Sequence, residues 1–119
     1  MTAGRFLFVG ERRSPRAVQL GYRLCDGRLA GQSLFAALEA CGIDPRRHVY
    51  CNLFERGGAR LVVEHQAAGA VVVGMGRKVQ AELRRRGIAH LALVHPAARG
   101  RIRKRARYAA HVRRALVRA

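Results

Sequence analysis

The chain has 119 residues, half of them hydrophobic, which is enough for one packed core and too few for two independent domains. Its 24 lysine and arginine residues against 7 acidic residues give a formal net charge of +17, more than solubility requires, so the expected partner is a polyanion. Within Arg77–Ala119 there are 14 basic residues and one acid, Glu82. We expect this part to contact nucleic acid rather than membrane, because no Trp or Phe anchor accompanies the charges. A basic surface that reflects only genomic arginine preference is the alternative.

The cysteines and the amino-terminal segment indicate a reducing compartment. Cys25, Cys41 and Cys51 are odd in number and contain no Cys-x-x-Cys pair, so they predict neither a zinc site nor a disulfide framework. The apolar run at Phe6–Val9 is too short for a signal-peptide core or a membrane-spanning helix. We therefore expect a cytoplasmic protein with reduced thiols and no membrane contact.

Apolar runs alternate along the chain between the strand period and the helix period. Such alternation favours a parallel sheet with helices on both faces. We predict a single domain over residues 1–119, with an α/β fold: a three-layer α/β/α sandwich around a central four-stranded parallel sheet. In chain order, the expected elements are a strand at Arg5–Val9, a long polar connection at Gly10–Ala30, a helix at Gly31–Cys41, a strand at His48–Asn52, a loop at Leu53–Ala59, a short helix at Arg60–Ala68, a strand at Ala70–Val73, a helix at Arg77–Arg86, a strand at Ile88–Val94 and a helix at about Lys104–Val117.

Residues suited to a binding site follow each predicted strand. Ligands of parallel α/β sheets bind beyond the carboxyl ends of the strands. Here these ends carry Gly10-Glu11, Asn52, Gly74-Met75-Gly76 and His95-Pro96. "GMGRKV" allows backbone N–H groups to approach an anion, but it matches neither the dinucleotide fingerprint nor the P-loop, so a tight turn before a helix is the favoured interpretation.

Three of these side chains are candidates for chemistry. Pro96 fixes the chain just after the His95 imidazole, and a basic segment follows. Glu11 either forms a surface ion pair with a neighbouring arginine or faces His95. Asn52 carries both a donor and an acceptor, which suits the edge of a base, although asparagine is equally common in turns.

Taken in order, "VGERRSP", "DGRLAGQSLFAALEACGIDPRRHVYCNLF", "VVVGMGRKVQAEL" and "LVHPAARG" resemble the four signature regions of the uracil-DNA glycosylase superfamily, with most similarity to its family 4-like branch. The resemblance covers about Phe6–Leu116 and is that of a minimal member. It implies a DNA glycosylase that flips uracil, or a related modified or deaminated base, out of DNA and hydrolyses its N-glycosidic bond in base-excision repair. It implies no metal and no cofactor, and the family's iron–sulfur cysteines are absent.

By position, the resemblance implies roles for individual residues. His95 would donate a hydrogen bond to the base oxygen that gains negative charge, and Glu11 would position water or stabilise the sugar cation. Asn52 completes the expected catalytic set. The expected base-binding residues are Gly10, Ser14, Tyr22 and Phe54, the last two as stacking faces. The expected phosphate-binding residues are Arg99, Arg101, Arg103, Lys104, Arg105 and Arg107.

Departures from the family pattern leave alternatives open. Arg12-Arg13-Ser14-Pro15 stands where the family has Ala-Pro-Gly, and Ala97 stands where it has serine. These differences are compatible with a non-catalytic DNA-binding or modified-base-reading protein on the same fold. An RNA- or ribosome-associated basic protein is a third hypothesis. The favoured partner is DNA, single- or double-stranded and lesion-containing, bound by a monomer.

Overall fold

Four parallel strands form the centre of the protein. The structure, a computed structural model, describes residues 5–97 and 105–117. The strand order is β2-β1-β3-β4, and every neighbouring pair is parallel. The predicted four-stranded parallel sheet is therefore confirmed. The strands are β1 (Phe6–Gly10), β2 (Val49–Asn52), β3 (Val71–Met75) and β4 (Leu91–Leu93).

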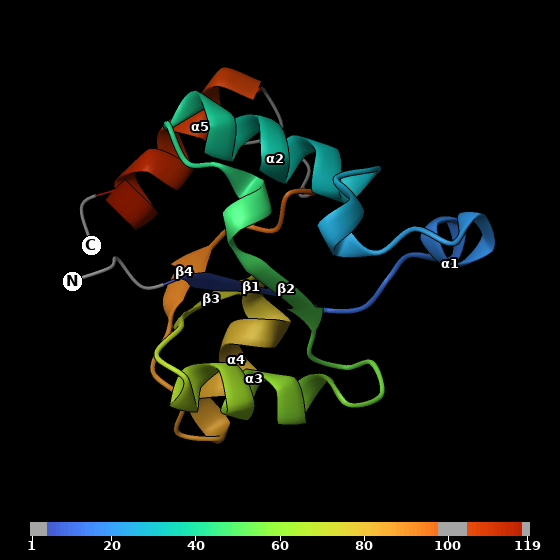
Figure 1. Cartoon of the computed structure of the whole chain (residues 1–119), viewed down its shortest axis with the longest axis vertical. Coiled ribbons are helices and arrows are strands. Elements are labelled where there is room, and N and C mark those ends of the chain that lie inside the picture. Colours follow the sequence, from blue (N-terminus) through green and yellow to red (C-terminus); the bar gives the residue numbers. More distant parts are fainter. Residues whose placement is uncertain (1–4, 98–104, 118–119) are drawn as a thin grey trace.

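Helices cover both faces of this sheet, which confirms the three-layer α/β/α sandwich (Figure 1). One face carries α2 (Ala30–Ala40) and α5 (Arg105–Val112), and a π-helical turn at Arg113–Val117 continues α5. The other face carries α3 (Gly58–Ala67) and α4 (Arg77–Arg85). Over the residues that the structure describes, no helix is both long and apolar enough to cross a bilayer.

The strands send alternate side chains into two separate apolar clusters, as the period of two in an extended chain requires. Phe8 and Val73 pack with α2 and α5, whereas Leu7 and Val72 pack with α3 and α4. All four are essentially inaccessible to solvent. Burial of each such side chain stabilises the fold by about 1.5–3 kcal/mol, so the sheet is held from both sides.

The segment predicted as a polar connection contains two short helices, α1 (Pro15–Leu20) and a 3-10 turn at Leu24–Asp26. Ser14 Oγ caps α1 by accepting from the N–H of Ala17 at 3.1 Å, and Pro15 occupies the first turn. No residue of α1 is buried, and the helix extends beyond the carboxyl end of β1, outside the two helical layers (Figure 1). Because α1 is stabilised by its cap and buries no apolar face, it has no hydrophobic periodicity from which it could be predicted.

Element ends also differ from the sequence prediction. The fourth strand is shorter than predicted, because the N–H of Ile88 donates to Leu83 O at 2.9 Å and closes the end of α4. Helix α3 begins at Gly58, two residues earlier than expected, after the left-handed Gly57. A 3-10 turn at Pro45–Arg47 leads into β2. None of these shifts changes the order of elements.

Candidate functional site

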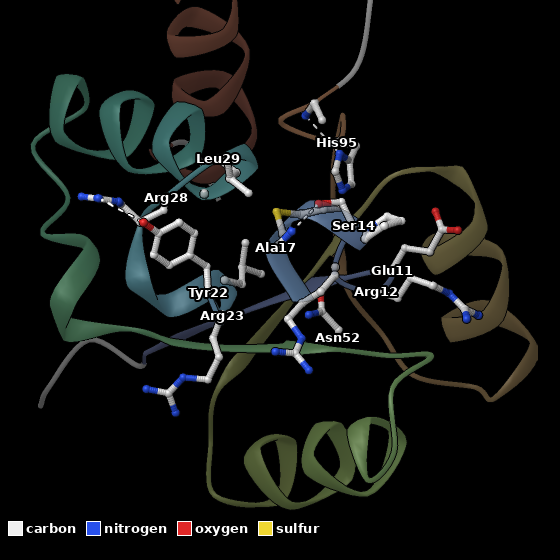
Figure 2. Close-up of a pocket in the computed structure, with 17 residues that line it drawn as sticks. Glu11, Arg12, Ser14, Ala17, Tyr22, Arg23, Arg28, Leu29, Asn52 and His95 are labelled. Atoms are coloured by element: carbon white, nitrogen blue, oxygen red, sulfur yellow. Dashed lines mark hydrogen bonds between the residues drawn. The ribbon is translucent and has the colours of Figure 1, made fainter. Parts of the chain in front are cut away.

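A cavity of about 310 Å³ opens at the carboxyl ends of the strands, as the rule for parallel sheets predicts. Its size lies within the range of about 300–1,000 Å³ typical of small-molecule sites. The loop after β1, the segment before α2 and the ends of β2 and β4 form its walls (Figure 2). Six residues predicted for the site line this one cavity: Gly10, Glu11, Ser14, Tyr22, Asn52 and His95.

Other predicted residues lie elsewhere. Phe54 is exposed and does not line the cavity; its ring lies under the Arg12 guanidinium, 5.9 Å from ring centroid to Cζ. Arg105 and Arg107 are exposed in the first turn of α5 and do not line the cavity either. The remaining predicted phosphate-binding residues, Arg99, Arg101, Arg103 and Lys104, lie outside the described residues.

Basic side chains from the amino-terminal half line the cavity instead. These are Arg12, Arg13, Arg23 and Arg28. These arginines were not predicted for the site, because the net positive charge of the chain is concentrated after Arg77. The signal was present in "ERRSPR" and "YRLCDGR", two arginine-rich stretches within the connection between β1 and α2.

One backbone hydrogen bond indicates which nitrogen of the His95 ring carries the proton. Its Nδ1 accepts the N–H of Ala97 at 3.0 Å, so the neutral ring carries its proton on Nε2. Burial lowers the pKa of His95, and the nearby Glu11 carboxylate opposes this with a smaller upward effect. His95 at neutral pH is therefore an uncharged imidazole with an Nε2–H donor, in the wall of the cavity (Figure 2).

Helices α4 and α5 hold the strand end that carries His95. The N–H of Val94 donates to His111 Nε2 at 2.9 Å, and the Tyr108 hydroxyl donates to Val94 O at 2.8 Å. On the preceding residue, Leu93 O accepts from Gln80 Nε2 at 2.9 Å. These bonds satisfy the backbone groups that follow the last ladder pair of β4. The imidazole is thus attached to a backbone segment held by hydrogen bonds, and neither Gln80 nor His111 was predicted to support it.

Acid is expected to destabilise the protein through three histidines that accept backbone N–H groups. Burial lowers the pKa of each below its ordinary value of about 6.5, so the unfolded chain takes up protons first. The contribution of these histidines to the free energy of unfolding is fully present above about pH 7 and is lost as the pH falls towards about 5. Urea unfolding at a series of pH values measures this loss. The acceptors and their donors are His48 and Phe6 (2.9 Å), His95 and Ala97, and His111 and Val94.

The His48→Asn variant separates this effect from general acid denaturation. An asparagine Oδ1 can accept from Phe6 as Nδ1 does, but it does not titrate. We expect a shallower loss of stability between pH 7 and 5 in this variant, whereas Gln66→Asn on α3, which changes no titratable group, keeps the original slope. Equal slopes in all three proteins would contradict the assignment.

Glu55 positions both Asn52 and the loop after β1. Its Oε2 accepts from the N–H of Arg13 at 2.5 Å, from Arg13 Nε at 3.4 Å and from Asn52 Nδ2 at 3.3 Å. Asn52 Oδ1 then lies over Gly10, where a Cβ would be 2.5 Å from this oxygen. A larger residue at Gly10 would displace the Asn52 amide from this position. Asn52 and Gly10 were predicted for the site but Glu55 was not, although it lies three residues after the strand-end asparagine.

Glu11 and Tyr22 lie on opposite sides of the cavity (Figure 2). Glu11 Oε1 is 3.7 Å from Lys78 Nζ, and both side chains are exposed enough that this pair contributes little to stability. The Tyr22 hydroxyl accepts from Arg28 at 3.3 Å, and the guanidinium lies 5.2 Å from the ring centroid. Beside this pair, Leu29 adopts a left-handed φ of 55° and stays 40% exposed, a strained apolar residue in the cavity wall.

Replacing Glu11 by glutamine is expected to lower the pKa of His95 further. The carboxylate favours the imidazolium, so its removal leaves desolvation without an opposing charge. Titration of the imidazole resonances by NMR measures the change. Glu64→Gln, which removes the partner of Arg60 on α3, serves as the matched control and should leave the His95 titration unchanged. A His95 pKa that stays the same or rises in Glu11→Gln would contradict the geometry.

Among residues 5–97 and 105–117, no three His, Cys, Asp or Glu side chains are grouped closely enough to hold a metal ion. Comparison with models of known protein families and with curated protein sequences finds no match.

Proposed function

We propose that this protein is a DNA-base glycosylase acting on uracil or a related modified or deaminated base. The observation that carries the proposal is the pairing of a neutral His95 Nε2–H donor with the Glu11 carboxylate and the Asn52 amide in one cavity. Cleavage of an N-glycosidic bond sends the bonding electrons into the base and leaves a cation-like sugar. A donor near the base and an anion near the sugar match those two developing charges.

In this proposal each residue has a defined task. His95 Nε2–H donates to the base oxygen as the bond to the sugar breaks, and Asn52 binds the edge of the base. Glu11 orients the water that adds to C1′ and stabilises the sugar cation until it does. Tyr22 offers a ring face for stacking, and the arginines around the cavity attract the phosphates of the strand.

A substrate screen tests the proposal directly. The purified protein is incubated with single-stranded and duplex oligonucleotides that contain uracil, hypoxanthine, xanthine or hydroxymethyluracil, and abasic sites are revealed by alkaline cleavage. We expect excision from a uracil or related pyrimidine strand. No excision from any of these substrates would overturn the enzymatic proposal.

A base-reading protein without catalysis is the second candidate. The Glu11 carboxylate lies 3.7 Å from the Lys78 ammonium, which partly neutralises the charge that the chemistry needs. Tight binding to a modified strand without product, unchanged in Glu11→Gln and His95→Ala, would favour this candidate.

Cellular setting and nucleic-acid type form part of the same proposal. All three cysteines are free thiols, which supports a reducing, cytoplasmic location. We propose that a monomer acts on DNA. Competition among single-stranded DNA, duplex DNA and structured RNA at fixed salt separates DNA recognition from an RNA- or ribosome-associated role.

A further inference from the structure

A second cavity, of about 320 Å³, lies next to the first. The two share four wall residues, Arg13, Arg23, Leu24 and Asn52, so they are neighbouring compartments along one surface. The second cavity lies over the end of β2 and the start of α3. Nothing in the proposed base chemistry uses it.

Three arginines, Arg13, Arg23 and Arg56, line this second cavity. The Arg13 side chain is one-third exposed and Arg23 is 72% exposed, so both guanidinium groups remain hydrated and accessible. Figure 2 shows Arg23 leaving the wall of the first cavity with its guanidinium directed away from the Tyr22 ring. Planar guanidinium groups bind phosphate oxygens with two parallel hydrogen bonds, which makes arginine the residue of choice for this anion.

Of the three arginines, Arg13 is paired with Glu55 at 3.4 Å, so Arg23 and Arg56 carry the excess positive charge of the cavity. Glu55 is the acid that lines the second cavity, and its Oε2 is already engaged by the Arg13 backbone, the Arg13 side chain and Asn52. Asp26 is 3.8 Å from Arg23, a distance at which an exposed pair is weak. The compartment therefore keeps a net positive charge.

We propose that the second cavity binds the backbone phosphate of the nucleotide adjacent to the one whose base enters the first cavity. This rests on the proposed function for the first cavity. In this proposal, Arg56 and Arg23 donate hydrogen bonds to the phosphodiester oxygens. Arg13, in the wall that the two cavities share, lies between the base and the phosphate. Glu55 holds Arg13 there through its backbone N–H. A polynucleotide strand thus crosses the protein from one cavity to the next over Asn52.

The test is a binding measurement that does not depend on cleavage. The probe is the trinucleotide d(TUT) with a 2′-fluoro group on the uridine sugar, which resists glycosidic cleavage, and inorganic phosphate and deoxyuridine are titrated separately. We expect Arg56→Gln to weaken trinucleotide binding by about tenfold at low salt. The slope of log affinity against log salt should fall by about 0.7, the value for one phosphate of a single strand. Affinity for deoxyuridine should not change.

Arg46→Gln is the matched control. This exposed arginine precedes β2, at the amino ends of the strands, and lines neither cavity. An equal loss in Arg46→Gln would show a general charge effect and overturn the subsite. NMR shifts of the Arg56 Nε–H with inorganic phosphate but not with the trinucleotide would show a free-anion site and overturn it as well. An Arg56-dependent trinucleotide affinity with no excision of any base would remove the glycosylase and leave the phosphate subsite.

Discussion

Replacing His95 by alanine is expected to slow base excision by about 10²–10³-fold, the usual cost of removing one preorganised donor to a developing anion. The Nε2–H is aligned before substrate arrives, because Nδ1 accepts from Ala97 and helix α5 holds Val94 on both its N–H and its carbonyl. Single-turnover kinetics on the best substrate of the screen measures the chemical step. Binding of the uncleavable strand should change far less than the rate, since the donor acts mainly on charge that develops as the bond breaks.

Two further variants separate this role from a structural one. His95→Gln keeps an N–H donor at the end of its side chain and should recover part of the rate, whereas His65→Ala on α3 should leave it unchanged. A rate that falls equally in His95→Gln and His95→Ala, together with lost stability, would indicate that the imidazole serves only the fold. A full rate in His95→Ala would remove it from the chemistry.

Gly58→Ala is expected to destabilise the protein by about 3 kcal/mol, the upper end of overpacking costs. A Cβ at this first residue of α3 would overlap the carbonyl oxygen of Asn52 and would lie 2.9 Å from Leu53 O. Both obstacles are backbone atoms, so neither can rotate away. The substitution would otherwise favour a helix by up to about 1 kcal/mol, so a loss of stability can only come from this contact.

Gly31→Ala in α2 serves as a milder case of the same steric conflict with backbone atoms. Its Cβ would meet a single backbone oxygen, Leu24 O, at 2.9 Å, so we expect a smaller loss in urea unfolding. Gly58→Ala should also weaken binding of the trinucleotide, because Asn52 lies in the wall that both cavities share. A Gly58→Ala protein as stable as the original would contradict the close packing of α3 on β2.

The motif residues of the site were predictable for a local reason. Glu11, Asn52 and His95 each follow an apolar run of strand length, and parallel strands bring such positions to one edge of the sheet. In the structure these three residues line one cavity. Their places at the ends of predicted parallel strands were therefore enough to group them.

Other parts of the site depend on the path of irregular segments. Phe54 and Tyr22 are both aromatic residues in connecting segments, but only Tyr22 lines the cavity, since the chain after β2 directs Phe54 to the surface beside Arg12. Glu55 could be seen as an acid in the sequence, yet its partner Arg13 lies 42 residues away. No local pattern encodes such a contact.

The parallel α/β sandwich, and the edge of the sheet at which the site forms, could be inferred from local patterns, because strand and helix periods are local properties of the chain. Three features required the folded chain: which arginines line the cavities, the tautomer of His95, and the second basic cavity beside the first. These features arise where residues distant in sequence meet, through side-chain directions and backbone hydrogen bonds that the folded chain alone specifies.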